Sequence, residues 1–339
     1  MLKISADKLN ALFAKIAANQ TLYIPVDRED GAAEYKKYES GMEMSRSLNT
    51  VRSAKDFFFP QTENLADFKM EGKNIEVIDI REESEDFVVF GVRACDARSF
   101  TILDKVFLCD PVDSYYKNRR DHGTIVTMAC TRPAETCFCG TFGIDPTAPE
   151  GDAACFSDGE NFFFKANNEK GQAFIDSISE MLEDGDTAKL DQVQAKTKAV
   201  LEKLPLAGLK TDSFGGEKLM EHFNSEKWAD LSESCIGCGT CTFVCPTCQC
   251  YDIRDFDTGH GLKRFRCWDS CMYSDFTKMA HGNSRNSQLE RFRQRFMHKL
   301  VYFPANNNGE FGCVGCGRCL SKCPISMNIV KVMKALEVK

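Results

Sequence analysis

The sequence predicts an α+β fold, in which an N-terminal α/β-type domain precedes a smaller cysteine-rich domain. Two observations lead to this prediction. Helix-like and strand-like segments alternate through the N-terminal part of the chain. The 18 cysteines of the 339-residue chain are also unevenly spread: residues 1–94 and 156–234 contain none, and twelve crowd into 235–323. We therefore divide the chain into residues 1–222 and residues 223–339.

The alternation begins with an amphipathic helix, because Leu9, Leu12, Phe13 and Ile16 recur at helical spacing. Runs of β-branched and aromatic residues predict four strands, at 21–26, 74–80, 86–92 and 125–129. Further helices are predicted at 97–107 and as two stretches within 171–204, and residues 205–216 are predicted to form a linker. The order of the strands in the sheet does not follow from these patterns.

The charge balance excludes several classes of function. Lys and Arg total 43 against 50 Asp and Glu, for a net charge of −7, which argues against bulk nucleic-acid or anionic-membrane binding. No apolar run approaches the roughly 20 residues of a membrane helix, and the first residues do not resemble a secretory signal. We expect a cytoplasmic protein, whose cysteines are more often metal ligands or redox groups than disulfides.

Two copies of one cysteine motif stand out. Residues 235–246 read CIGCGTCTFVCP and residues 313–324 read CVGCGRCLSKCP. Both follow the spacing C-x2-C-x2-C-x3-C-P of bacterial two-cluster ferredoxins. The first three cysteines of such a run wrap one [4Fe–4S] cluster, and intervening glycines let the backbone fold tightly around it. Two complete copies predict two [4Fe–4S] clusters.

The fourth cysteine of each run ligates the other cluster in such proteins. The first cluster is therefore assigned to Cys235, Cys238, Cys241 and Cys323. The second is assigned to Cys313, Cys316, Cys319 and Cys245. Structural zinc is the alternative, but zinc sites use cysteine pairs separated by a longer spacer, which does not fit these runs.

A spacer of about 67 residues separates Cys245 from Cys313. Leu289, Phe292, Phe296 and Leu300 lie on one helical stripe there, with Ser284, Asn286 and Ser287 available to cap its start. We therefore expect a helical two-[4Fe–4S] ferredoxin domain with a long insertion between its motifs. The insertion is basic, with nine Lys or Arg against three Asp or Glu from 263 to 299. This charge forms either a solvated face or a docking surface, or it offsets anionic clusters; its densest residues are Arg264, Arg266, Arg291, Arg293 and Arg295.

Ten cysteines remain outside the two motifs. Cys248, Cys250, Cys267 and Cys271 are best interpreted as small buried residues packed near the clusters. In the N-terminal domain, Cys95 and Cys130 each follow a predicted strand, and a C-x-C pair comes soon after. Strand ends meet at one edge of a parallel sheet, so four thiolates could complete a third [4Fe–4S] site there. Its predicted ligands are Cys95, Cys130, Cys137 and Cys139, with Asp96, Cys109 and Cys155 as alternatives.

Other cofactor signatures are missing. The sequence has neither G-x-G-x-x-G after a strand nor G-x-x-x-x-G-K-[ST], and its five histidines are scattered. A chain with clusters but no substrate or flavin signature is most simply an electron conduit.

Taken together, the motifs resemble a known family. Residues 57–65 (FFFPQTENL), 91–107 (GVRACDARSFTILDKVF), 113–120 (DSYYKNRR) and 137–143 (CFCGTFG) accompany the two ferredoxin runs. This combination is similar to the iron–sulfur subunits of anaerobic sulfite reductase and of cytosolic sulfhydrogenase, where it is the beta subunit. Related subunits occur in electron-bifurcating transhydrogenases and in heterodisulfide-reductase-linked NADH modules. FFFPQTENL is closer to the hydrogenase and bifurcating groups, which disfavours sulfite reduction.

The resemblance implies a multi-subunit complex. A flavoprotein partner would hold FAD and a [2Fe–2S] centre and react with NAD(P)H, while a subunit of this type relays single electrons to a further redox subunit. It also implies that Cys95, Cys130, Cys137 and Cys139 are cluster ligands. The expected function is thus a non-catalytic electron-transfer subunit. The alternatives are the iron–sulfur subunit of anaerobic sulfite reductase, a stand-alone reductase with a substrate-binding N-terminal cluster, and a redox-sensing or assembly protein.

Overall fold

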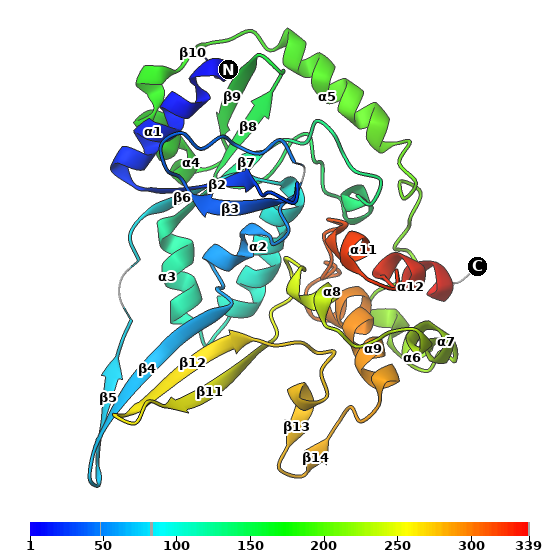
Figure 1. Ribbon diagram of the computed structural model, residues 1–339. Coiled ribbons are helices and arrows are strands. Elements are labelled where there is room, and N and C mark those ends of the chain that lie inside the picture. The colour runs from blue at the N-terminus through cyan, green and yellow to red at the C-terminus, as the bar shows by residue number, and fades with distance from the viewer. Residues whose placement is uncertain (48, 82–83, 338–339) are drawn as a thin grey trace.

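The structure is a computed structural model that describes residues 1–47, 49–81 and 84–337. Its N-terminal part is built on an eight-stranded sheet (Figure 1). In spatial order the strands are β10 (Glu183–Asp184), β1 (Leu2–Ser5), β9 (Asn161–Ala166), β8 (Ala153–Ser157), β7 (Gly123–Met128), β6 (Phe87–Val92), β2 (Thr21–Asp27) and β3 (Ala33–Lys37). The pairs β2–β6, β6–β7 and β7–β8 are parallel, and the outer pairs are antiparallel.

The central strand β6 is buried along its whole length, which explains its continuous apolar run. Because side chains alternate along a strand, Val88 and Phe90 enter the core on one face and Val89 the core on the other. The first core also contains residues of α1 (Leu9–Asn19) and α4 (Glu169–Ser177), and the second contains residues of α2 (Ala94–Phe107) and α3 (Ser114–His122). Helices therefore cover both faces of the sheet.

Most predicted elements of this part are present. The four residues of the first helical stripe are buried on α1, and the predicted strands 21–26, 86–92 and 125–129 correspond to β2, β6 and β7. The stretch 171–204 contains α4 and α5 (Ala188–Leu201). The helix predicted from 97 begins earlier, at Ala94, so that Cys95 lies in its first turn.

A second sheet projects from the body as an arm (Figure 1). Its strands in spatial order are β11 (Tyr251–Asp257), β12 (Leu262–Trp268), β4 (Thr62–Glu71) and β5 (Asn74–Asp79). The predicted strand at 74–80 is therefore β5, outside the main sheet. The spacer between the cysteine motifs is not helical throughout, because its residues 251–268 form a hairpin that pairs with β4 through β12. Local periodicity gave no sign of this pairing, since β4 lies almost two hundred positions earlier in the sequence.

The C-terminal part consists of short helices around a core that includes Trp228, Phe292, Phe296 and Met333. These elements are α6 (Leu219–Phe223), α7 (Lys227–Glu233), α8 (Thr240–Phe243), α9 (Gln288–Met297), η7 (His298–Tyr302), α10 (Phe303–Asn306), α11 (Arg318–Lys322) and α12 (Ile329–Leu336), with a small β13–β14 hairpin (Lys278–Met279 and Gly282–Asn283). Ser287, one of the three candidate caps, caps α9 through a capping box with Glu290. No helix in 1–47, 49–81 or 84–337 has the length and apolarity needed to cross a membrane.

Candidate iron–sulfur cluster sites

Each ferredoxin motif forms a tight loop that leads into a short helix, α8 in the first motif and α11 in the second. The glycines inside both loops have left-handed backbone angles, with φ of +67° and +74° at Gly237 and Gly239 and of +60° and +77° at Gly315 and Gly317. Only glycine adopts this conformation without a steric penalty. Glycine therefore stands at the positions where the backbone of each cysteine loop turns most tightly.

The cysteines of the first predicted set line one cavity. Cys235, Cys238 and Cys241 come from the first motif and Cys323 from the end of the second. The cavity also contacts Arg295 of α9 and the aromatic side chain of Phe292. In the fold, the four cysteines assigned above to the first cluster therefore lie together, and their ligation of a cluster stays a prediction.

The surroundings of Arg295 indicate whether this cavity fits an anionic cluster. Its side chain is 2% exposed, its Nε donates to Cys241 Sγ at 2.9 Å, and its Nη2 donates to the Cys241 carbonyl at 2.8 Å. Its Nη1 has no partner among the described residues. A buried guanidinium without a carboxylate is costly unless an anion faces it. Four thiols and an unsatisfied N–H therefore fit an iron–sulfur cluster with its thiolate ligands.

The second set, Cys245, Cys313, Cys316 and Cys319, lies next to the first. The Cys319 thiol interacts electrostatically with the thiols of Cys316, Cys313 and Cys245. Burial raises the pKa of Cys316 to about 12 and that of Cys319 well above its ordinary value. Such thiols stay protonated at neutral pH unless a metal deprotonates them. Among the described residues, no group of three or more His, Cys, Asp or Glu side chains is placed so that it could hold a single metal ion.

The four N-terminal cysteines also converge. Cys95 lies in the first turn of α2 after β6, and Cys130 follows the parallel neighbour β7. With Cys137 and Cys139 they line one cavity, and Cys316 of the second set lines the same cavity. Burial raises the pKa of Cys130 to about 11 and that of Cys139 to about 12. The carboxyl edge of the sheet thus meets the second ferredoxin motif.

The alternatives to these four cysteines lie elsewhere or are already occupied. Both carboxylate oxygens of Asp96 accept hydrogen bonds from Arg318, so this residue is not free to replace a thiolate. Cys109 is exposed in a loop after α2, and Cys155 is buried in the sheet core with α1 and α4. These three residues are thus poor candidates for the site.

The spare cysteines of the C-terminal part pack near the motifs. The Cys248 thiol lies next to that of Cys245, and the Cys271 thiol lies next to that of Cys250. The Cys271 contact lowers the pKa of Cys250. Cys267 lies on β12 and is only half-buried.

The basic stretch of the spacer does not form one surface. Arg266 is 3% exposed and binds Glu63 and Asp113, whereas Arg264 lies in the open and pairs with Asp255. Arg295 points into the first cavity, as described above. The stretch is therefore distributed between buried ion pairs, the arm and the cluster sites.

Sequence reasoning missed three buried cations beside the motifs. Lys55 Nζ donates to the carbonyls of Cys245 and Cys248, at 3.2 and 2.9 Å. Lys299 and Arg318 are 5% and 4% exposed. The position of Arg318 inside the second motif could have pointed to it. Nothing in the sequence around Lys55 or Lys299 indicates that they are buried, because distant segments of the chain cover them.

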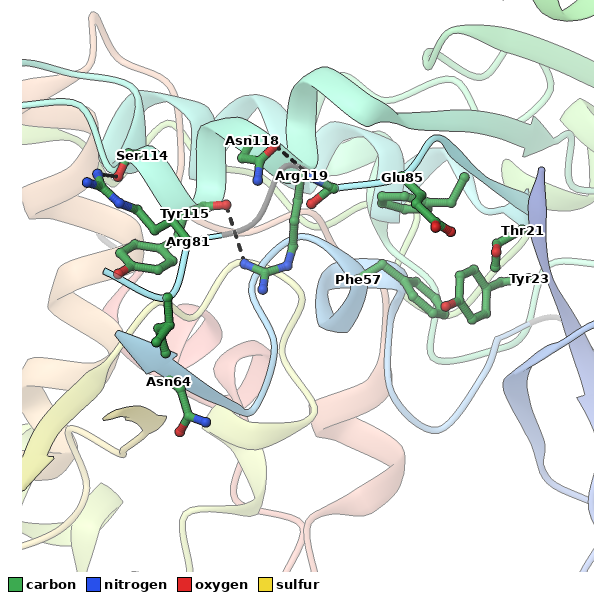
Figure 2. A pocket seen from close by; sticks show the side chains of 13 residues that line it. Thr21, Tyr23, Phe57, Asn64, Arg81, Glu85, Ser114, Tyr115, Asn118 and Arg119 are labelled. Atoms are coloured by element: carbon green, nitrogen blue, oxygen red, sulfur yellow. Dashed lines mark hydrogen bonds between the residues drawn. The ribbon is translucent and has the colours of Figure 1, made fainter. Parts of the chain in front are cut away.

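A separate cavity of about 580 Å³ lies at the base of the arm, against α3 (Figure 2). Its lining includes Arg81, Arg119, Asn64 and Tyr115. Both guanidinium groups already pair with carboxylates, of Asp79 and Glu63 respectively. Within the described part of the chain, none of the predicted cluster ligands lines this cavity, and we assign no ligand to it.

Comparisons with known proteins agree with this geometry. The family profile described as "4Fe-4S dicluster domain" matches residues 234–327, which span both motifs. The fold and its cysteine sets therefore define an iron–sulfur protein of the electron-transfer class. The chain is 31% identical to sulfhydrogenase 2 subunit beta of Pyrococcus furiosus over 338 residues, which cover 98% of this chain and 96% of that protein. It belongs to the family of sulfhydrogenase beta-type iron–sulfur subunits. No solved structure matches the chain.

Proposed function

We propose that this chain relays single electrons between an FAD- and NAD(P)H-binding flavoprotein subunit and a further redox subunit. The complex would be a cytoplasmic oxidoreductase of anaerobes, of the electron-bifurcating transhydrogenase or hydrogenase type. FAD and a [2Fe–2S] centre would reside on the partner. On this chain, three sets of four cysteines would hold three [4Fe–4S] clusters, within the proposed domains 1–222 and 223–339, the second of which carries the long insertion.

The observation that supports the relay most strongly is the adjacency of the three cysteine sets. Cys316 lines the N-terminal cavity with Cys95, which joins the third set to the second. Arg295 donates a hydrogen bond to Cys241 of the first set and interacts electrostatically with Cys245 and Cys319 of the second. This side chain therefore links the two sets. The second set is therefore the middle one. A [4Fe–4S] cluster, when bound, accepts and releases one electron at a time.

The chain's own residues would hold and insulate these centres. Phe292, Phe296 and Met272 wall the first cavity, and buried side chains of the second motif close the middle set. Exclusion of water strengthens the electrostatic influence of nearby charges on a metal centre. This arrangement would bind the clusters and shield them from water.

Two other functions receive less support. An iron–sulfur subunit of anaerobic sulfite reductase remains an alternative on the resemblance of the motifs alone. A stand-alone reductase would need an open coordination position in the N-terminal site. Four thiols line that cavity, and Asp96, the candidate labile ligand, is held by Arg318. The geometry thus favours a relay over a substrate-binding cluster.

The first test is anaerobic analysis of iron and acid-labile sulfide, with EPR of the dithionite-reduced chain. We expect about twelve iron per chain, four for each of three clusters. Cys137→Ser should remove one EPR signal, whereas Cys109→Ser, at an exposed cysteine outside all sets, should leave the spectrum unchanged. About eight iron with an unaltered Cys137→Ser spectrum would refute the third cluster, and zinc without iron would refute the whole proposal.

The second test addresses the partners. The chain is expressed anaerobically with its flavoprotein, and the complex is mixed with NADH or NADPH. We expect stable co-purification and NAD(P)H-dependent appearance of the reduced cluster signals. A lone monomer whose clusters stay oxidised in the presence of flavoprotein and NAD(P)H would contradict the relay function.

A further inference from the structure

Two buried cations lie one helical turn apart between the first and second cysteine sets. Arg295 is on α9 and is 2% exposed; Lys299 is on η7 and is 5% exposed. The segment η7 is a π-helix, an irregularity that is rare in helices and is often found at functional sites. Buried Arg and Lys side chains are uncommon unless they are paired.

Within residues 1–47, 49–81 and 84–337, neither cation has a carboxylate partner. Among the described residues, no ion pair includes Arg295 or Lys299, whereas the buried guanidiniums of Arg266 and Arg318 each hold an acidic side chain. Lys299 Nζ donates instead to Thr247 Oγ1 at 2.6 Å and to the Gly312 carbonyl at 2.9 Å. Both of these acceptors lie next to predicted ligands, since Thr247 hydrogen-bonds to Cys245 and Gly312 precedes Cys313.

The charges of the two cations are faced by thiols. Charge interactions link Arg295 to the thiols of Cys241, Cys248, Cys319 and Cys245, which include ligands predicted for both clusters. Charge interactions link Lys299 to the thiols of Cys245 and Cys248 and, more weakly, to that of Cys313. Arg295 therefore acts on both sets, and Lys299 acts mainly on the second set.

We propose that Arg295 and Lys299 set the reduction potentials of the first two clusters and hold them above the value that the thiolate ligands alone would give. The inference rests on the proposed function. Each reduction adds one negative charge to a cluster, and a fixed positive charge in a dry, weakly polarisable surrounding stabilises the reduced form. The two cations would thereby decide which donors can pass an electron into this part of the relay.

The test is an anaerobic potentiometric titration followed by EPR, on the full chain loaded with its clusters. Arg295→Gln removes the charge and keeps much of the side-chain volume. We expect the ratio of reduced to oxidised cluster at a fixed ambient potential to fall about tenfold for both signals, a shift of about 59 mV for a one-electron couple. Lys299→Gln should lower the reduction potential of the second cluster more than that of the first.

Arg293→Gln is the matched control. It removes the same charge from the same helix, but Arg293 is half-buried over the Phe223 ring and donates to the Phe223 carbonyl. We expect unchanged potentials in this variant. Arg295→Lys keeps the charge and alters the hydrogen bond to Cys241, and it should retain most of the wild-type potential.

Unchanged potentials in an iron-replete Arg295→Gln variant would overturn the inference, as would equal shifts in Arg295→Lys and Arg295→Gln. If Arg295→Gln loses iron, Lys299→Gln decides, because Lys299 donates to the Thr247 hydroxyl and the Gly312 carbonyl rather than to a cysteine thiol. Unshifted potentials in that variant refute the inference. A wild-type chain that holds no iron would refute the proposed function instead, so the two failures are distinguishable.

Discussion

The two ferredoxin motifs have the same spacing and nearly the same sequence, yet their surroundings differ. In the first motif, Ile236 is 64% exposed and Cys238 is exposed. At the equivalent positions of the second motif, Val314 is 2% exposed and Cys316 is 9% exposed. The second motif packs against the N-terminal C-x-C loop, where the Phe138 amide donates to the Gly315 carbonyl at 3.0 Å.

The difference shows how one local pattern can serve two purposes. The first motif presents its cysteine loop toward solvent. The second motif is a junction, because it contacts both the first motif and the N-terminal domain. The residue after the second glycine changes accordingly, from Thr240 to Arg318, and Arg318 binds Asp96 of the N-terminal domain.

The largest expected effect is at this junction. Arg318→Met should destabilise the protein by about 3–5 kcal/mol, because it leaves the buried Asp96 carboxylate without its partner. Thr240→Ala, the equivalent change in the first motif, should cost less than about 1 kcal/mol, because what it removes is the hydrogen bond that the Thr240 hydroxyl accepts from Cys238 Sγ at 3.3 Å. Anaerobic urea unfolding measures both. Equal losses would show that the two motifs are supported alike.

A smaller difference is expected between the motif glycines. A Cβ at Gly315 would lie 2.4 Å from the Phe138 carbonyl oxygen, whereas one at Gly237 would lie 3.2 Å from the flexible side chain of Gln288. Both positions have positive φ. Gly315→Ala should therefore cost roughly 2–4 kcal/mol, from backbone strain and overpacking, and Gly237→Ala about 1–2 kcal/mol, from strain alone. The same unfolding assay would contradict this expectation if Gly237→Ala were the more damaging substitution.

The pH dependence of stability should also point to the second motif. His298 lies on η7, next to Lys299, whose backbone approaches Gly312; burial, followed by the charges of Lys299, Arg285 and Arg295, lowers the pKa of His298 to about 4. The unfolded chain binds this proton near pH 6.5, so the stability contribution is complete above that pH and is lost as the pH falls toward 4. We expect a loss of about 1–2 kcal/mol between pH 7 and pH 5.

His298→Gln is the control for this prediction, since it removes the titrating group. Unfolding midpoints at pH 7 and pH 5 are compared for the two proteins. The variant should lose less stability than the wild type over this interval. An identical loss in both proteins would assign the effect to carboxylates elsewhere in the chain.

The smallest expected effect is kinetic. Because Cys238 is exposed and Cys316 is buried, limited exposure to ferricyanide or a chelator should remove the EPR signal of the first cluster before that of the second. Stopped anaerobic samples, taken as a time series, would resolve the order. Simultaneous loss of the signals would mean that solvent reaches both motifs equally.

Local patterns were enough to predict several elements. The periodicity of Leu9 to Ile16 identified α1, and one of the three candidate caps before the apolar stripe, Ser287, is the residue that caps α9. Spacing also predicted which cysteines group together, because a C-x2-C-x2-C run brings three thiols together within one short loop. The crossed grouping with Cys323 agrees with the cavity in the fold, although the ligation itself stays a prediction.

By itself, then, the sequence determined the class of cofactor site, the strongly periodic helices and the buried parallel strands, since each depends on residues close together in the chain. Only the tertiary structure decided that β12 pairs with β4 and that Cys316 shares a cavity with Cys95. It also decided that Arg295 and Lys299 are buried, with no carboxylate partner among the described residues. The physical reason is distance along the chain. Arg318 and Asp96 are 222 positions apart, and no periodicity or spacing rule reports on a contact that forms only when separate segments fold against each other.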